Sequence, residues 1–158
     1  GVDLMLAVDV SGSMEALDFT LDGQPANRLD CVKSVVSKFV EARPNDRIGL
    51  VAFAGAPYLV SPLTLDHEWL KQNLDRVRIG LIEDSTAIGS ALATSVNRLR
   101  DQPSKSKIVV LLTDGMNNAG KVAPQTAAEA AKAMGVKVYT IGAGAQGEPR
   151  HDHPAARS

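Results

Sequence analysis

Residues 2–13 read Val-Asp-Leu-Met-Leu-Ala-Val-Asp-Val-Ser-Gly-Ser, and this stretch decides how the rest of the chain is interpreted. The run from Val2 to Val10 is short and almost continuously apolar, which is typical of a strand buried on both faces of a sheet. It leads into Asp9, Ser11 and Ser13, which are spaced two residues apart. Alternate residues of an extended segment face the same way, so a turn after the strand would let the three side chains converge. One carboxylate and two hydroxyls are hard oxygen donors, which favour Mg²⁺, Mn²⁺ or Ca²⁺ over zinc.

Apolar periodicity predicts alternating strands and helices along the rest of the chain. We expect Asn27 to cap a helix that ends before Pro44, and Gly135 to end a helix that Pro124 begins. The polar stretch 15–27 and residues 78–86 are expected to be loops. Further strands are expected at 47–54, 58–64, 107–113 and 136–141, and helices at 29–43, 66–77, 88–99 and 124–134.

This order indicates an α/β domain with a doubly wound, mostly parallel sheet and helices on both faces. The turn at 55–57 is too short for a crossover connection, so the strand at 58–64 should run antiparallel to the strand before it. Pro62 lacks a backbone N–H and suits an edge position.

Length and composition limit the alternatives. The chain has 158 residues, 44% of them hydrophobic and 4% aromatic, which fits one domain with an aliphatic core. The formal net charge of −1 gives no reason to expect nucleic-acid binding. Cys31 is the single cysteine, so an internal disulfide is excluded, and its place in an apolar helical stripe predicts a buried thiol.

The two ends of the sequence predict a piece of a longer protein. The chain opens on Gly1 without an initiator Met, a signal peptide or a stretch of about 18 apolar residues, so any membrane anchor would lie elsewhere in the parent. We expect the domain to span 1–146. The tail 147–158 lacks periodicity and is expected to be disordered or foreign to the domain, with His151 and His153 binding transition metals at most adventitiously.

Two further oxygen donors occupy suitable positions. Asp114 follows the strand at 107–113, and Thr86 lies just before the helix that begins at Ile88. Ligands of doubly wound folds collect beyond the carboxyl ends of the strands, where the winding direction reverses. If the strands that lead into Asp9 and Asp114 are neighbours, one cation can contact both carboxylates.

Three motifs in this order, Asp9-x-Ser-x-Ser, Thr86-Ala-Ile-Gly and Thr113-Asp-Gly, resemble the metal-ion-dependent adhesion site of von Willebrand factor A (vWA) domains, and the resemblance covers residues 1–144. It implies that the hydroxyls of Ser11, Ser13 and Thr86 coordinate a divalent cation, expected to be Mg²⁺ (with Mn²⁺ or Ca²⁺ as possibilities). It implies that Asp9 and Asp114 bind the ion directly or through water, and that one position stays open for a carboxylate of a partner protein. The expected rim of the site comprises Met14, Glu15, Ser85, Gly115, Met116 and Asn117.

Within that family the chain is similar to bacterial Bat (aerotolerance-type) proteins, through Asp-Val-Ser-Gly-Ser-Met (9–14), Asp-Arg-Ile-Gly-Leu-Val-Ala-Phe-Ala (46–54) and Val-Tyr-Thr-Ile-Gly (138–142). The resemblance implies a parent anchored in the bacterial inner membrane. It implies partners among MoxR-type AAA+ ATPases and other Bat-type proteins.

Two departures from the family pattern stand out. Ser85 replaces an expected Gly. The C-terminal strand and helix of a vWA domain are missing from the sequence, which would leave the strand 136–141 as a bare edge capable of self-association.

The sequence gives less support to nucleotide-binding and catalytic alternatives. Residues 115–122 nearly match a phosphate-binding loop, but Val122 stands where a hydroxyl residue is required. Residues 142–147 match Gly-x-Gly-x-x-Gly without a following helix. No base for a serine nucleophile is evident, so no catalytic residue is assigned. A metal-dependent hydrolase built on the same Asp/Ser/Thr cluster stays open as the alternative, and its general base is unidentified.

Overall fold

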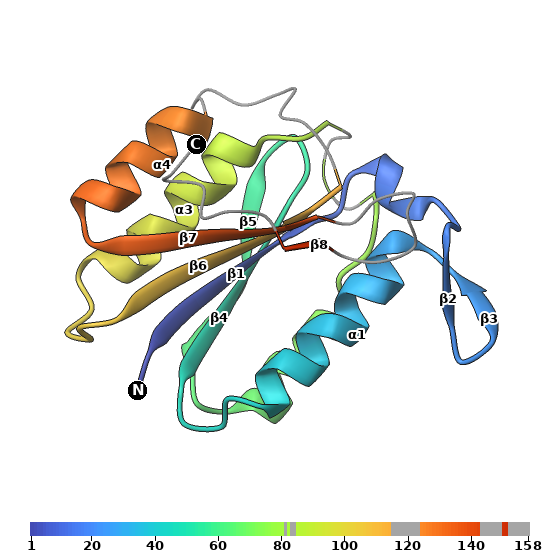
Figure 1. Cartoon of the computed structure of the whole chain (residues 1–158), viewed down its shortest axis with the longest axis horizontal. Coiled ribbons are helices and arrows are strands. Elements are labelled where there is room, and N and C mark those ends of the chain that lie inside the picture. Colours follow the sequence, from blue (N-terminus) through green and yellow to red (C-terminus); the bar gives the residue numbers. More distant parts are fainter. Residues whose placement is uncertain (81, 83–84, 115–123, 143–149, 152–158) are drawn as a thin grey trace.

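The computed structural model describes residues 1–80, 82, 85–114, 124–142 and 150–151. Within these residues one sheet has the strand order β5-β4-β1-β6-β7-β8, and β2 and β3 form a separate hairpin (Figure 1). The strands are β1 (Asp3–Asp9), β2 (Phe19–Leu21), β3 (Gln24–Ala26), β4 (Arg47–Phe53), β5 (Pro57–Thr64), β6 (Lys107–Thr113), β7 (Val136–Gly142) and β8 (Arg150–His151). The helices are the 3₁₀ turn η1 (Gly12–Glu15), α1 (Arg28–Glu41), α2 (His67–Asp75), α3 (Ile88–Arg100) and α4 (Pro124–Ala133).

The predicted sheet is confirmed. β1 lies between β4 and β6 and is parallel to both, and β6 is parallel to β7. β5 is antiparallel to β4 at one edge of the sheet, as the short turn required, and it accommodates Pro62 there. Because the central strands are parallel, their carboxyl ends meet at one end of the molecule.

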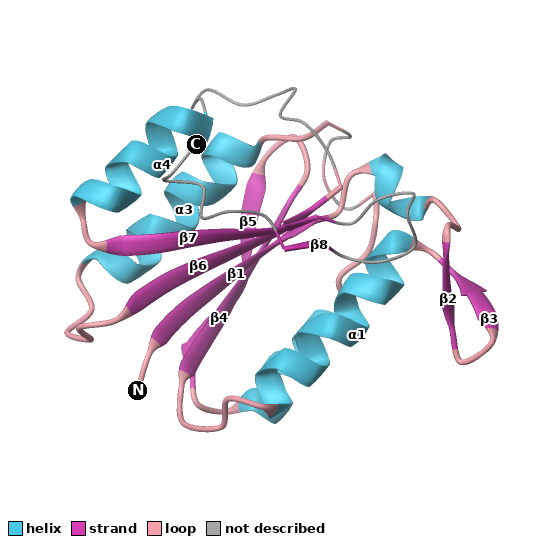
Figure 2. Cartoon of the chain, in the orientation of Figure 1, coloured by secondary structure: helices cyan, strands magenta, loops and turns pink. Residues whose placement is uncertain are grey.

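Helices lie on both faces of the sheet (Figure 2), and an apolar cluster fills each side. On one face, Leu6 and Leu50 of the strands pack with side chains of α1 and α2. On the other face, Met5 and Val109 pack with side chains of α3 and α4. Alternate residues of each central strand therefore serve opposite cores, which explains why these strands are almost wholly apolar.

Helix α1 begins where the sequence predicts. The side chain of Asn27 caps it by accepting a hydrogen bond from the Asp30 backbone N–H at 2.7 Å. Cys31 lies on its inward face and is buried, as predicted. Within the described part of the chain, no helix is long and apolar enough to cross a membrane.

The prediction of a loop throughout 15–27 is wrong. Strands β2 and β3 form an antiparallel hairpin that extends beyond the N-terminal end of α1 (Figure 1). Its two turn residues, Asp22 (φ 51°) and Gly23 (φ 78°), both have positive φ, as a type I′ turn requires. The Asp-Gly pair is a strong hairpin signal, but strands of three residues are too short to show alternation.

The C-terminal predictions need a correction. Arg150 and His151 form strand β8, which pairs antiparallel with Gly142 and Ile141, so the tail is not wholly without structure. The outer edge of β7 is therefore paired at its carboxyl end. Among the strands described, none pairs with Val136 to Thr140 on that side. The rest of the tail, and residues 115–122 and 143–147 of the two glycine-rich segments, lie outside the described residues.

Candidate metal site

Asp9 ends β1 and is fully buried. One carboxylate oxygen, Oδ1, accepts a hydrogen bond from the Ser11 backbone N–H at 2.8 Å. The other, Oδ2, accepts one from the Thr113 hydroxyl at 2.7 Å. These two bonds fix the carboxylate at the carboxyl end of the sheet, between the chain that leaves β1 and the last residue of β6.

Ser11 and Ser13 follow directly. Their Oγ atoms lie 3.2 Å apart, with Ser11 buried and Ser13 exposed. Neighbouring ligands of an octahedral Mg²⁺, at about 2.1 Å from the ion, lie about 3 Å from each other. The two hydroxyls are therefore spaced as two adjacent ligands of one hard cation would be.

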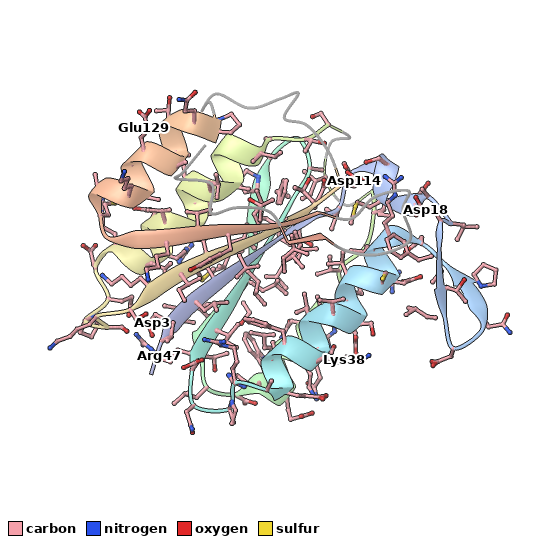
Figure 3. The ribbon with its side chains drawn as sticks, in the orientation of Figure 1. Asp3, Asp18, Lys38, Arg47, Asp114 and Glu129 are labelled. Carbon is pink, nitrogen blue, oxygen red and sulfur yellow. The ribbon has the colours of Figure 1, made fainter. Side chains whose placement is uncertain are left out.

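Asp114 follows β6, which is the neighbour of β1, so the two carboxylates leave adjacent parallel strands, which is the condition for sharing one cation. The Asp114 side chain is 2% exposed, and its Oδ2 accepts a hydrogen bond from Nη1 of Arg28 at 2.8 Å. Figure 3 shows Asp114 at one end of the sheet, near Asp18 and far from Asp3 and Arg47.

Thr86 is held at the same end of the sheet by a backbone hydrogen bond of the residue that follows it. It is 6% exposed, and the next residue, Ala87, donates a backbone hydrogen bond to the Ala54 carbonyl at 2.7 Å. Ala54 directly follows β4, the other neighbour of β1. The segment before α3 is thus attached to the end of the sheet at which Asp9 lies.

The electrostatics of Asp9 favour a nearby cation. Burial raises the pKa of the Asp9 carboxyl, and this outweighs the hydrogen bonds from Ser11 and Thr113, which lower it. The negative charge of Asp114 raises it further. A positive ion between the two carboxylates would relieve both effects.

The donor set fits a hard divalent ion. The parts of the chain that the structure describes contain no group of three or more His, Cys, Asp or Glu side chains that could hold a metal. A metal at this end of the sheet would therefore take hydroxyl oxygens beside the two carboxylates. Such an all-oxygen set suits Mg²⁺, Mn²⁺ or Ca²⁺.

The expected rim requires one correction. Met14 is 0% exposed and belongs to the core beside α1, because the turn of η1 directs its side chain inward. It cannot contact a partner from that position. Glu15 is exposed and Ser85 is partly exposed. Gly115, Met116 and Asn117 lie outside the described residues.

Sequence reasoning missed Arg28 and Asp18, and it quoted Thr113 within a motif without assigning it a contact. Thr113 bonds to Asp9, and Arg28 joins Asp114 to Asp18. The sequence did contain a signal for Arg28. A positive charge in the first turn of a helix is unfavourable because of the helix dipole, so it indicates that a side-chain partner holds the arginine there.

The sequence model of the von Willebrand factor type A domain matches residues 3–153. A curated relative, an uncharacterized protein of Borreliella burgdorferi, is 32% identical over 148 residues, which cover 94% of this chain. The chain spans 42% of the length of that relative, so it corresponds to less than half of it.

Two solved structures are similar to this chain in fold and sequence. An aerotolerance-related membrane protein from Bacteroides fragilis superposes with a TM-score of 0.81 at 32% identity, over 90% of this chain and 67% of that one. Proximal thread matrix protein 1 from the mussel byssus, described as having a zinc-occupied MIDAS motif, has a TM-score of 0.72 at 26% identity, over 89% of this chain and 37% of its own.

Proposed function

This chain belongs to the von Willebrand factor type A domain family, and on that premise we propose that it is a metal-ion-dependent protein-binding module. Asp9, Ser11, Ser13, Thr86 and Asp114 would hold one divalent cation, with Mg²⁺ as the expected ion. A carboxylate of a partner protein would complete the coordination of that ion.

One observation carries the proposal: three segments distant in sequence meet at one end of the sheet. The Thr113–Asp9 bond joins the ends of β6 and β1, and the Ala87–Ala54 bond holds the Thr86 segment to the end of β4. Each segment contributes oxygen donors. None of these donors belongs to the two apolar clusters on either side of the sheet.

The charge balance favours a partner carboxylate. A divalent cation supplies a Lewis-acidic centre, and its charge is matched by Asp9 and Asp114. The remaining donors of this chain are neutral hydroxyls, so they stabilise the cation less than a third carboxylate would. An acidic side chain that arrives from outside therefore gains a strong metal–oxygen contact.

The hydrolase alternative needs a general base, and Asp9, Asp114 and His67 are each engaged in other contacts. Asp9 accepts two hydrogen bonds in a buried position, and Asp114 is paired with Arg28. His67 bonds to the Asp46 carbonyl at 2.8 Å, beside Val2 and the amino end of β1. We therefore favour binding over catalysis.

We further propose a bacterial membrane setting. The aerotolerance-related protein is described as a membrane protein, and the match covers 90% of this chain and 67% of that one. The parent would be anchored in the inner membrane, with this domain outside the bilayer. Its partners would include a MoxR-type AAA+ ATPase and other Bat-type proteins.

Calorimetric titration tests the metal site. The wild-type domain should bind Mg²⁺ and Mn²⁺, and Asp9→Asn should weaken binding at least about tenfold. Asp101→Asn is the matched control, because the Asp101 side chain is 86% exposed at the far end of α3. A parallel Zn²⁺ titration compares the ion named for the mussel relative. Equal affinities for wild type and Asp9→Asn would contradict the proposal.

Binding and hydrolysis are then separated on the same proteins. Peptides with a single Asp or Glu should bind in Mg²⁺ and not in EDTA, and their Asn or Gln counterparts should not bind in either. Turnover of phosphoesters or peptides that disappears in Asp9→Asn would instead favour the enzyme.

A further inference from the structure

Arg28, the first residue of α1, connects the candidate metal site to the loop before the β2–β3 hairpin. Its Nη1 donates to Oδ2 of Asp114 at 2.8 Å. Its Nε and Nη2 donate to the Asp18 carboxylate at 2.8–3.2 Å. The guanidinium is largely shielded, with the Arg28 side chain 16% exposed between an Asp114 that is 2% exposed and an Asp18 that is 23% exposed.

The helix itself does not need this arginine. A positive charge in the first turn of a helix is unfavourable, because the helix dipole is positive there. Asn27 already caps α1, and Asp30 supplies the negative charge that the first turn favours. The backbone N–H of Arg28 donates to the Ala16 carbonyl at 3.1 Å, which fixes Arg28 against the segment that follows the Ser13 turn. The position of Arg28 is therefore explained by its side-chain partners.

The geometry leaves Asp114 able to serve a cation. Among the described residues, the contact with Arg28 uses Oδ2, so Oδ1 could serve the ion or one of its waters. A guanidinium held by another carboxylate restricts rotation of Asp114, which a hydroxyl or a water would do less strictly. Groups that hold a metal ligand in this way commonly change metal affinity by about 10–100-fold when they are removed.

Charge explains why Asp18 is part of the arrangement. An isolated arginine would neutralise Asp114 and repel an incoming cation. Arg28 and Asp18 together sum to zero, so Asp114 keeps the net negative charge that a divalent ion requires. The Arg28–Asp18 pair can thus orient the Asp114 carboxylate without cancelling its negative charge.

From these contacts we propose that Arg28 is the positioning residue for Asp114, and that Asp18 acts as its counter-charge. This inference rests on the proposed metal-binding function and adds to it. It also links the hairpin loop to the metal site through side-chain contacts, because Asp18 lies one residue before β2.

Calorimetry on the Arg28→Gln variant of the full chain tests the inference. Mn²⁺ affinity from calorimetry should fall about 10–100-fold. Arg28→Lys keeps the charge but cannot reach both carboxylates with a planar fork, so its affinity should lie between those of wild type and Arg28→Gln. The Arg28→Lys variant also provides the test if Arg28→Gln does not fold. Asp18→Asn should weaken Mn²⁺ binding as well, because Arg28 then neutralises Asp114.

A matched control separates positioning from simple stabilisation. Arg47 also donates to a buried aspartate, Asp3, through Nε at 2.8 Å and Nη2 at 2.6 Å, at the opposite end of the sheet (Figure 3). Arg47→Gln should reduce the free energy of unfolding in EDTA and leave the Mn²⁺ affinity unchanged. In an Asp114→Asn background, Arg28→Gln should cause no further loss of Mn²⁺ affinity, because its effect passes through Asp114.

The outcomes are distinguishable. A wild-type domain that binds no Mn²⁺ overturns the metal-binding function and this inference with it. If the wild type binds Mn²⁺ and Arg28→Gln binds it equally well or more tightly, the metal site stands and the role of Arg28 is overturned. An additive loss in the Asp114→Asn background would also overturn it.

Discussion

The hydroxyl of Thr113 donates a hydrogen bond of 2.7 Å to the carboxylate of Asp9, across 104 positions of sequence. It joins the last residues of two neighbouring parallel strands, β1 and β6. Both partners are buried, with Asp9 at 0% and Thr113 at 5% exposure. The bond therefore belongs both to the stability of the sheet and to the orientation of the candidate metal ligand.

Thr113→Val should lower the free energy of unfolding by about 1–3 kcal/mol, because it leaves a buried carboxylate oxygen without a donor and keeps the side-chain shape. Urea denaturation in EDTA measures the change. Thr20→Val, at an exposed position of β2, should stay within about 0.5 kcal/mol of wild type. A Thr113→Val domain as stable as wild type would show that the bond contributes nothing.

Divalent metal should stabilise the folded domain. A ligand at 100 times its Kd adds about 2.7 kcal/mol, which corresponds to a rise in Tm of about 5–10 °C for a domain of this size. Thermal melts in MgCl₂ or MnCl₂ should show the rise, and excess EDTA should reverse it. The same rise in Asp9→Asn would place the ion elsewhere on the molecule.

Gly49→Ala should destabilise the domain by about 1–3 kcal/mol through overpacking between β1 and β5. A Cβ on Gly49 would lie 2.5 Å from Sδ of Met5, 3.0 Å from the Ser61 carbonyl oxygen and 3.1 Å from the Leu63 nitrogen. Denaturation measures the cost. The double variant with Met5→Ala should cost less than the sum of the two single changes, because the shortest contact is gone. Strict additivity would contradict this account.

The Cys31 thiol should react slowly in the folded protein. Burial raises its pKa, and the nearby negative charge of Asp18 raises it further. The thiolate is the reactive form, so at pH 8 the folded domain holds less of it than the unfolded chain does. Iodoacetamide should alkylate Cys31 much faster in urea than in buffer, and the rate for the folded domain should rise with pH. Equal rates in the two solvents would contradict a buried thiol.

Weak self-association through β7 is expected at high concentration. Within the structure as described, β8 pairs with Ile141 and Gly142 and leaves the edge from Val136 to Thr140 without a strand partner. Lys137 is exposed on this strand, and an edge lysine discourages close pairing, so the association should be weak. Light scattering should show a mass that rises with concentration, and a constant monomer mass would refute the expectation.

The main architecture could be predicted from sequence because its signals are strong. Runs such as 107–113 are continuous and β-branched, and the short turn at 55–57 fixes an antiparallel neighbour. The order of the strands was harder to predict, yet placing Asp9 and Asp114 in one site required β1 and β6 to be adjacent, and they are. Periodicity therefore predicted the elements, and the chemistry of the motifs predicted one pairing between them.

The errors have local physical causes. Met14 follows the site in sequence, and a single 3₁₀ turn was enough to send its side chain into the core. Arg28 and Asp18 reach the site only through side chains whose direction depends on the hairpin, and the hairpin itself was missed. Residues that act through tertiary contacts carry little signal in their own neighbourhood of the sequence.

The hairpin turn at Asp22 and Gly23 has a practical consequence. An added Cβ at Gly23 would meet nothing within 4 Å, and the residues of the turn are exposed. Longer or different loops could therefore be grafted at this tip, by selection or by an engineer, without disturbing the aliphatic interior.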